Sequence, residues 1–211
     1  MAAIDYRNSK GERLKGVTTI LGNILAKPAL VPWAYKRGKD NLPLYESRDK
    51  AATAGTLAHL YVSNHLKGLP DPFHDGLPQD VINKAESCYL AFLEWEKAHS
   101  FKMVESELSL VSEQYQFGGT IDIGAILNDL GIVDIKTSGG VYFSMRCQIV
   151  AYGKLWEENF PDKPVKSYHL LRLGEEGDFS HHYWPSLENE WEVFKACLKI
   201  QEILTVTKQK L

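Results

Sequence analysis

Two short apolar segments near the middle of the chain carry charged residues where core residues would be expected. Asp122 lies within residues 120–127, and Asp134 and Lys136 lie within residues 131–136. A buried carboxylate is costly unless it is paired or binds a cation. These residue types therefore indicate a divalent-cation site with a lysine beside it. The alternative, a hairpin whose acids face water, conflicts with the apolar composition of both segments, which is typical of a sheet covered on both sides.

The register of this predicted hairpin decides whether the charged side chains meet. With a three-residue turn over residues 128–130, Asp122 stands opposite Lys136 and diagonal to Asp134, on one face of the sheet. A four-residue turn would place Asp122 on the opposite face. We therefore expect the three-residue turn, with Asp122, Asp134 and Lys136 converging on one face.

Two further residues are candidates for the same site. His59 lies in a predicted helix over residues 51–67, one turn beyond Gly55. A glycine inside a helix costs about 1 kcal/mol relative to alanine, so Gly55 predicts close packing against another element. His59 is compatible with a structural role or with metal ligation. Glu107, in a predicted strand over residues 101–112, is a candidate accessory acid that could equally face solvent.

The periodicity of the chain predicts an α/β fold in one domain spanning residues 1–211. Residues 1–100 form a mainly helical part, residues 101–184 a sheet core with one helix, and residues 185–211 a C-terminal helix. The expected helices cover residues 51–67, 77–100, 143–159 and 187–206, and the remaining expected strands cover residues 165–173 and 178–184.

Composition narrows the class of protein. The chain is 44% hydrophobic and 24% charged, which is ordinary for a globular protein. It has no apolar run long enough to span a membrane and no signal-peptide pattern, so we expect a cytoplasmic protein. The three cysteines, Cys88, Cys147 and Cys197, fit neither a disulfide framework nor a four-cysteine metal site.

Positive charge is concentrated near the N-terminus. Residues 1–50 hold ten Lys or Arg against five Asp or Glu, although the whole chain has a net charge of −3. Trp33 lies close to Lys36, Arg37 and Lys39, and rings beside cations can stack bases and hold phosphates. A core tryptophan beside a solvated helix end explains the same pattern equally well.

Four motifs in sequence carry a resemblance to a known family. They are Gly55-x-x-x-His59, Gly119-x-x-Asp122, Asp134-Ile-Lys136-Thr-Ser and Gln148-x-x-x-Tyr152. Their order and spacing resemble the RecB-like branch of the PD-(D/E)xK nucleases, which includes phage exonucleases, CRISPR-adaptation nucleases and the mitochondrial genome-maintenance exonuclease. The resemblance spans about residues 17–155.

The resemblance implies a restriction-endonuclease-like core, a mixed central sheet flanked by helices. It also implies that His59, Asp122, Asp134 and the Ile135 carbonyl bind one or two Mg²⁺ or Mn²⁺ ions. Lys136 would then orient or activate the attacking water. Gln148, Tyr152 and Thr137 would contact the nucleic acid. The three cysteines do not fit the spacing of the iron–sulfur members, so we expect no cluster.

The implied activity is a metal-dependent DNA exonuclease that favours single strands, in phage or host replication, recombination or repair. If the chain is phage-encoded, the expected location is the host cytoplasm. No separate recognition domain is visible, which argues against site-specific cleavage. Two alternatives stay open: a flap endonuclease of the same fold, or a weakly catalytic DNA-binding or assembly subunit. The sequence identifies no protein partner.

Overall fold

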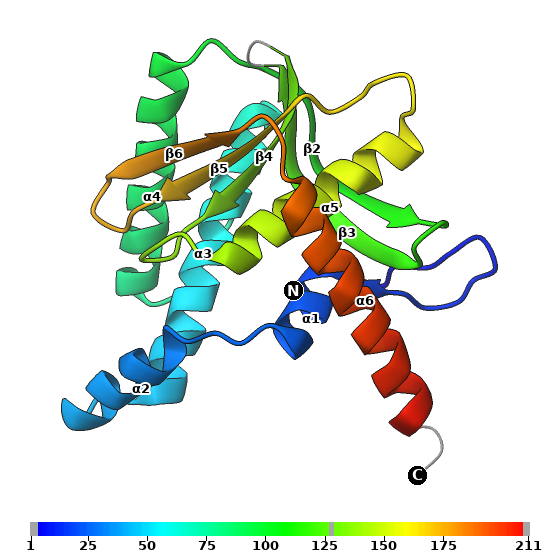
Figure 1. Ribbon diagram of the computed structural model, residues 1–211. Helices are drawn as coiled ribbons and strands as arrows, with labels where there is room; N and C mark the ends of the chain where they lie inside the picture. Colours follow the sequence, from blue (N-terminus) through cyan, green and yellow to red (C-terminus); the bar gives the residue numbers. More distant parts are fainter. Residues whose placement is uncertain (1–3, 127–128, 209–211) are drawn as a thin grey trace.

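One mixed sheet of six strands forms the centre of the molecule (Figure 1). The computed structural model describes residues 4–126 and 129–208. The helices are α1 (Val17–Ile24), α2 (Leu30–Lys39), α3 (Leu44–Leu66), α4 (Gln79–Ala98), α5 (Phe143–Asn159) and α6 (Glu188–Lys208). The strands are β1 (Lys15–Gly16), β2 (Lys102–Ser112), β3 (Phe117–Ile126), β4 (Leu130–Lys136), β5 (Ser167–Leu173) and β6 (Phe179–Trp184).

Helices cover the sheet on both faces. Helices α3 and α4 pack on one face, where Phe92 and Trp95 contact a cluster that includes Val133 of β4. Helices α1, α5 and α6 pack on the other face, where Phe194 belongs to a cluster with Ile132. Ile132 and Val133, which are neighbours in β4, therefore pack into two separate hydrophobic cores on opposite faces of the sheet. This two-sided burial explains the almost continuous apolar sequence of the central strands and confirms the predicted α/β class.

The boundaries of most predicted elements are close to the observed ones, but the short helices α1 and α2 were not predicted and α3 starts earlier than expected. Helix α5 covers the predicted residues, whereas α3 begins at Leu44 rather than at residue 51. The extra turns contain an ion pair between Glu46 and Lys50, four residues apart, which supports a helix. Pro43 occupies the position before the first helical residue.

The register between β3 and β4 differs from the predicted register by two residues. Ile123 pairs with Val133 and Ile126 with Leu130. Extending this ladder places Asp122 opposite Asp134 rather than Lys136, which corrects the prediction. Residues 127 and 128, assigned to the strand end and the turn, lie outside the described residues, and Leu130 belongs to β4 rather than to the turn. A shift of two residues preserves the face that each position occupies, so apolar alternation alone could not distinguish the two registers.

Strand β3 has a gap along one edge. Strand β2 pairs along the other edge, from Phe117 to Ile126. The gapped edge pairs with β1 only at Phe117 and Gly118, and with β4 only from Ile123 onward. Residues 119–122 therefore lie where the sheet opens, and Asp122 is the last of them before β4 joins.

Candidate metal centre

Asp122 lies at the point where β3 and β4 separate. Its Oδ2 atom accepts a hydrogen bond of 2.7 Å from the Ile135 N–H, in place of a backbone partner. Burial alone would raise the pKa of Asp122, but His59, Lys136 and the Ile135 N–H together lower it below its usual value. The carboxylate is therefore held ionised at the opening of the sheet.

Helix α3 brings His59 to this carboxylate. His59 Nδ1 lies 3.6 Å from Asp122 Oδ1. Burial opposes protonation of this imidazole, yet Asp122 raises its pKa above the usual value. The helix approaches closely because Gly55 faces the chain after β4: a Cβ atom at Gly55 would lie 2.7 Å from Thr137 Oγ1. The close packing predicted for Gly55 is confirmed, and its partner is Thr137.

Glu107 joins His59 and Asp122 in a compact group. One ligand atom from each of these residues lies within 4.8 Å of the others, and the described part of the chain contains no other such group of three. Glu107 lies between the paired residues Ser106–Ile123 and Leu108–Ile121, directly across from Asp122. Burial of its carboxyl and the charge of Asp122 raise the pKa of Glu107 to about 7, although the residue as a whole is exposed.

An irregular backbone turns Glu107 toward the group. Its φ angle is 54°, in the left-handed region that few residues other than glycine adopt. Ser106 contacts Ser63 of α3, whereas Leu108 packs in the core on the other face. Residues two apart in a regular strand share a face. Ser106 and Leu108 lie on opposite faces, so the alternation of side chains between the two faces of the sheet is interrupted at Glu107; we call this a change of phase. Strand β3 changes phase across from it, because Ile121 and Ile123 belong to opposite cores.

Asp134 forms a second charged unit with Lys136. It is fully buried, and its Oδ2 atom lies 2.5 Å from Lys136 Nζ. Burial raises the pKa of Asp134 to about 6, even though the lysine opposes this shift. Asp134 does not belong to the group formed by His59, Glu107 and Asp122. Glu107, which was predicted only as an accessory acid, therefore lies beside the His59 imidazole, and Asp134 does not.

A side chain of helix α5 donates a hydrogen bond to the Asp134 carboxylate. The Gln148 side-chain amide donates to Asp134 Oδ1 at 3.4 Å and to the Tyr152 hydroxyl at 2.8 Å. The Tyr152 ring is buried against Gly119, where a Cβ atom would lie 2.8 Å from it. Gln148 therefore lies beside Asp134, and Tyr152 lies beside Gln148, one turn further along the same face of α5.

A row of three hydroxyls, which the sequence did not predict, lies beside the carboxylates. Tyr6 Oη lies 2.9 Å from Thr120 Oγ1, which lies 2.8 Å from Ser109 Oγ. The Tyr6 ring occupies the space that a side chain at Gly118 would need. The consecutive glycines in β3 were the available signal, because glycine in a strand often marks a close approach by another segment.

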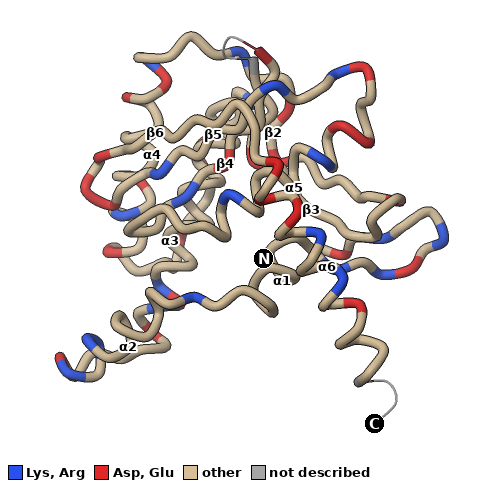
Figure 2. Tube along the Cα trace, in the orientation of Figure 1, with Lys and Arg blue, Asp and Glu red and all other residues tan. Residues whose placement is uncertain are grey.

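The basic N-terminal residues lie on a helix of their own. No residue of α2 is buried, and the Arg37 guanidinium lies 5.8 Å from the centre of the Trp33 ring. Helix α2 projects from the body below the first turns of α3 (Figure 1). Figure 2 shows Lys and Arg at its outer end. The structure thus leaves Lys36, Arg37 and Lys39 outside the group around Asp122.

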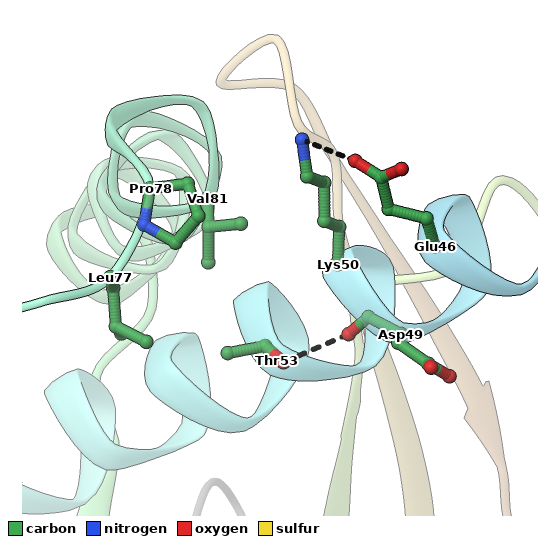
Figure 3. A pocket seen from close by; sticks show the side chains of 7 residues that line it. All are labelled: Glu46, Asp49, Lys50, Thr53, Leu77, Pro78 and Val81. Atoms are coloured by element: carbon green, nitrogen blue, oxygen red, sulfur yellow. Dashed lines mark hydrogen bonds and ion pairs between the residues drawn. The ribbon is translucent and has the colours of Figure 1, made fainter. Parts of the chain in front are cut away.

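A separate pocket lies between the first half of α3 and the start of α4 (Figure 3). Its lining mixes acidic, basic and apolar side chains: Glu46, Asp49, Lys50, Thr53, Leu77, Pro78 and Val81. It contains none of the residues grouped around Asp122.

No helix within the described residues has the length and apolar character needed to cross a membrane.

Comparisons with known proteins give similar solved structures but no match to a family or to a curated protein. No family model matches the chain. No curated protein matches it. The fold is similar to the crystal structure of a "Putative exonuclease" from Eubacterium rectale, with a TM-score of 0.49 and 12% sequence identity, over 75% of this chain and 69% of that chain.

Proposed function

We propose that the protein is a metal-dependent DNA exonuclease of the RecB-like PD-(D/E)xK type. The observation that carries this proposal is the row of acids across three adjacent strands. Glu107 of β2 lies across from Asp122 of β3, and Asp122 and Asp134 are the residues directly next to the Ile123–Val133 pair, where the β3–β4 ladder ends. His59 approaches from α3, and Lys136 lies beside Asp134. Cation ligands with a positive side chain beside them suit the hydrolysis of a phosphodiester, because both offset the charge that grows on the phosphate.

The residues present fit a divalent cation. Two carboxylates and one imidazole converge within 4.8 Å, and hard oxygen ligands suit Mg²⁺ or Mn²⁺. The imidazole favours Mn²⁺ of the two. We propose that His59, Glu107 and Asp122 hold the ion, with Asp134 and the Ile135 carbonyl completing the site. A bound cation would neutralise charge growing on the phosphate and lower the pKa of a coordinated water.

The remaining residues position the reactants. Lys136 pairs with Asp134 and would orient or activate the attacking water. Its positive charge also offsets acids that would otherwise repel the incoming phosphate. Gln148 and Tyr152 fix the orientation of Asp134 from α5. Thr137, packed under Gly55, is a candidate phosphate contact beside Lys136.

The rings and cations of α2 support a proposed preference for single-stranded DNA. Trp33 is half-buried with the Arg37 guanidinium above its ring, and Tyr35 is 75% exposed. Rings and cations together bind unpaired bases and their phosphates. We propose that α2 and the beginning of α3 guide a single strand towards the opening in the sheet.

Cleavage of end-labelled DNA tests this function. Single-stranded, double-stranded and flap substrates, each labelled at one end, are incubated with Mg²⁺, Mn²⁺ or chelator. An exonuclease releases nucleotides or short products progressively from an end of the single strand, and chelator stops the reaction. Release of an intact flap would instead establish the structure-specific endonuclease. Binding without cleavage under any metal condition would establish a non-catalytic subunit.

A further inference from the structure

The hydroxyl row formed by Tyr6, Thr120 and Ser109 has one more hydrogen-bond donor than its internal contacts use. Each hydroxyl can donate one hydrogen bond, so the row holds three donors. Its two internal contacts, of 2.9 and 2.8 Å, use two of them. Within residues 4–126 and 129–208, these hydroxyls make no other side-chain hydrogen bond. One O–H is therefore available to an acceptor from outside the protein.

The row continues the line of the carboxylates. Ser109 lies two residues from Glu107 along β2, and Thr120 lies two residues from Asp122 along β3. Two residues of a strand span roughly 6.6–6.8 Å. Thr120 alternates with Ile121, which packs against α1, α5 and α6, so Thr120 points to the face that α3 approaches. A chain molecule bound at the carboxylates would thus meet the hydroxyls about one repeat unit further along.

Contacts of the N-terminal segment with β3 and the residues before it hold Tyr6 beside Thr120. The Tyr6 ring lies over Gly118, where a Cβ atom would collide with it, and close to Gly16, where a Cβ atom would lie 3.0 Å from it. The Leu14 N–H donates to the Tyr6 carbonyl at 2.8 Å, and Asn8 bonds to Gln116 at 2.8 Å, which fastens the segment beside β3. Burial of the Tyr6 hydroxyl raises its pKa, so the group stays a neutral donor at physiological pH.

We propose that the Tyr6 hydroxyl donates this O–H to the phosphodiester group next to the one that is cleaved. In this arrangement Ser109 donates to Thr120 and Thr120 donates to Tyr6, so the proton of Tyr6 is the one directed outward. This inference rests on the proposed nuclease function and adds a site to it. A neutral O–H donates well to a phosphate oxygen, and it does so without a positive charge that would compete with the cation for the carboxylates. The row thereby sets the position of the strand relative to the metal centre.

The experiment combines a hydroxyl deletion with a backbone deletion in the substrate. Tyr6→Phe and Thr120→Val remove one hydroxyl each and keep the shape of the side chain. The substrates are single-stranded oligonucleotides in which one phosphate, one or two steps from the cleaved bond, is replaced by a neutral methylphosphonate. Tyr183→Phe, on the exposed outer strand β6, serves as the matched control.

We expect Tyr6→Phe to raise KM about tenfold on normal DNA, the loss of one hydrogen bond to a charged group, with kcat nearly unchanged. Methylphosphonate at the adjacent position should slow the wild-type enzyme by a similar factor and cost the variant nothing more. Mn²⁺ affinity and melting temperature should stay close to the wild-type values. Tyr183→Phe should behave as wild type.

Additive losses from the variant and the methylphosphonate would overturn the inference, because the two groups would then act separately. A sensitivity of Tyr6→Phe to replacement of the sugar, but not of the phosphate, would overturn it as well. Unchanged kinetics in the Tyr6→Phe enzyme would also overturn it. If the wild-type protein cleaves no DNA with either metal, the proposed function itself fails, which is a different result.

Discussion

Glu107 and Asp122 lie across from each other at the positions where β2 and β3 change phase. The left-handed backbone of Glu107 is the visible part of this irregularity. Strained backbone conformations cost of order 1–3 kcal/mol and persist where the surrounding structure holds them. Here the strain turns a carboxylate that a regular strand would place elsewhere toward Asp122 and His59.

Glu107→Gln should weaken metal binding by at least tenfold, because it removes one charged ligand from a group of three. Isothermal titration with Mn²⁺ measures this directly. Glu105→Gln is the matched control, since Glu105 lies on the same strand and is exposed. Equal Mn²⁺ affinities in the two variants would remove Glu107 from the site.

Asp134→Asn and Lys136→Ala should each abolish cleavage, because one removes a carboxylate of the site and the other the adjacent positive charge. Each also breaks a buried ion pair, which costs up to about 3–5 kcal/mol of unfolding free energy. The double variant Asp134→Asn/Lys136→Gln leaves no unpaired charge. We expect it to be inactive but more stable to urea than either single variant, and a double variant less stable than both would contradict the pairing.

Charge reversal of Lys36, Arg37 and Lys39 to glutamate should weaken binding of single-stranded DNA and flatten its salt dependence. Each phosphate contact contributes about 0.7 to the slope of log K against log salt for a single strand. Binding is measured by fluorescence anisotropy on the Lys136→Ala background, where DNA stays intact. Reversal of Lys10, Lys97 and Lys199, which are exposed elsewhere, is the control. An unchanged slope in the α2 variant would place the DNA path on another surface.

Acid should destabilise the sheet near β6 through two histidines, His169 and His181. His169 Nδ1 lies 3.0 Å from His181 Nε2, and His181 Nδ1 lies 3.4 Å from His99 Nε2. Burial and the neighbouring imidazoles lower the pKa of His169 to about 4, and burial and His99 lower that of His181. The unfolded chain, with a histidine pKa of about 6.5, therefore binds more protons than the folded one.

Stability should consequently fall as pH decreases from about 6.5 to about 4, with His169 contributing on the order of 3 kcal/mol. Urea titrations at a series of pH values measure this dependence. In His169→Gln the fall over this window should be shallower than in the wild type. Parallel wild-type and His169→Gln curves would contradict the assignment.

The parts of the site that depend on local patterns were predictable from the sequence. Gly55 indicated a close approach of α3, and the structure supplies Thr137 as the neighbour. The bounds of α5 followed from its composition, so Gln148 and Tyr152 share a face. These features depend on helix geometry within a few residues, which periodicity specifies well.

The parts that depend on strand register were less accessible. Apolar alternation fixes only the parity of the β3–β4 pairing, and the predicted register was therefore wrong by two residues. The left-handed conformation of Glu107 has no sequence signal, because glycine or asparagine would be expected at such a position. The contact between Tyr6 and Thr120 joins residues 114 positions apart, beyond the range of any local pattern.

Cleavage of end-labelled single-stranded DNA by the wild type and by Asp122→Asn, purified in parallel, tests the central claim most directly. Asp122→Asn keeps the size of the side chain and removes the charge that lies between His59 and the Ile135 N–H. Wild-type protein should degrade the strand with Mn²⁺ or Mg²⁺ and stop with chelator, and the variant should be inactive throughout. Equal cleavage by both proteins, or cleavage that persists in chelator, would contradict a metal centre at Asp122.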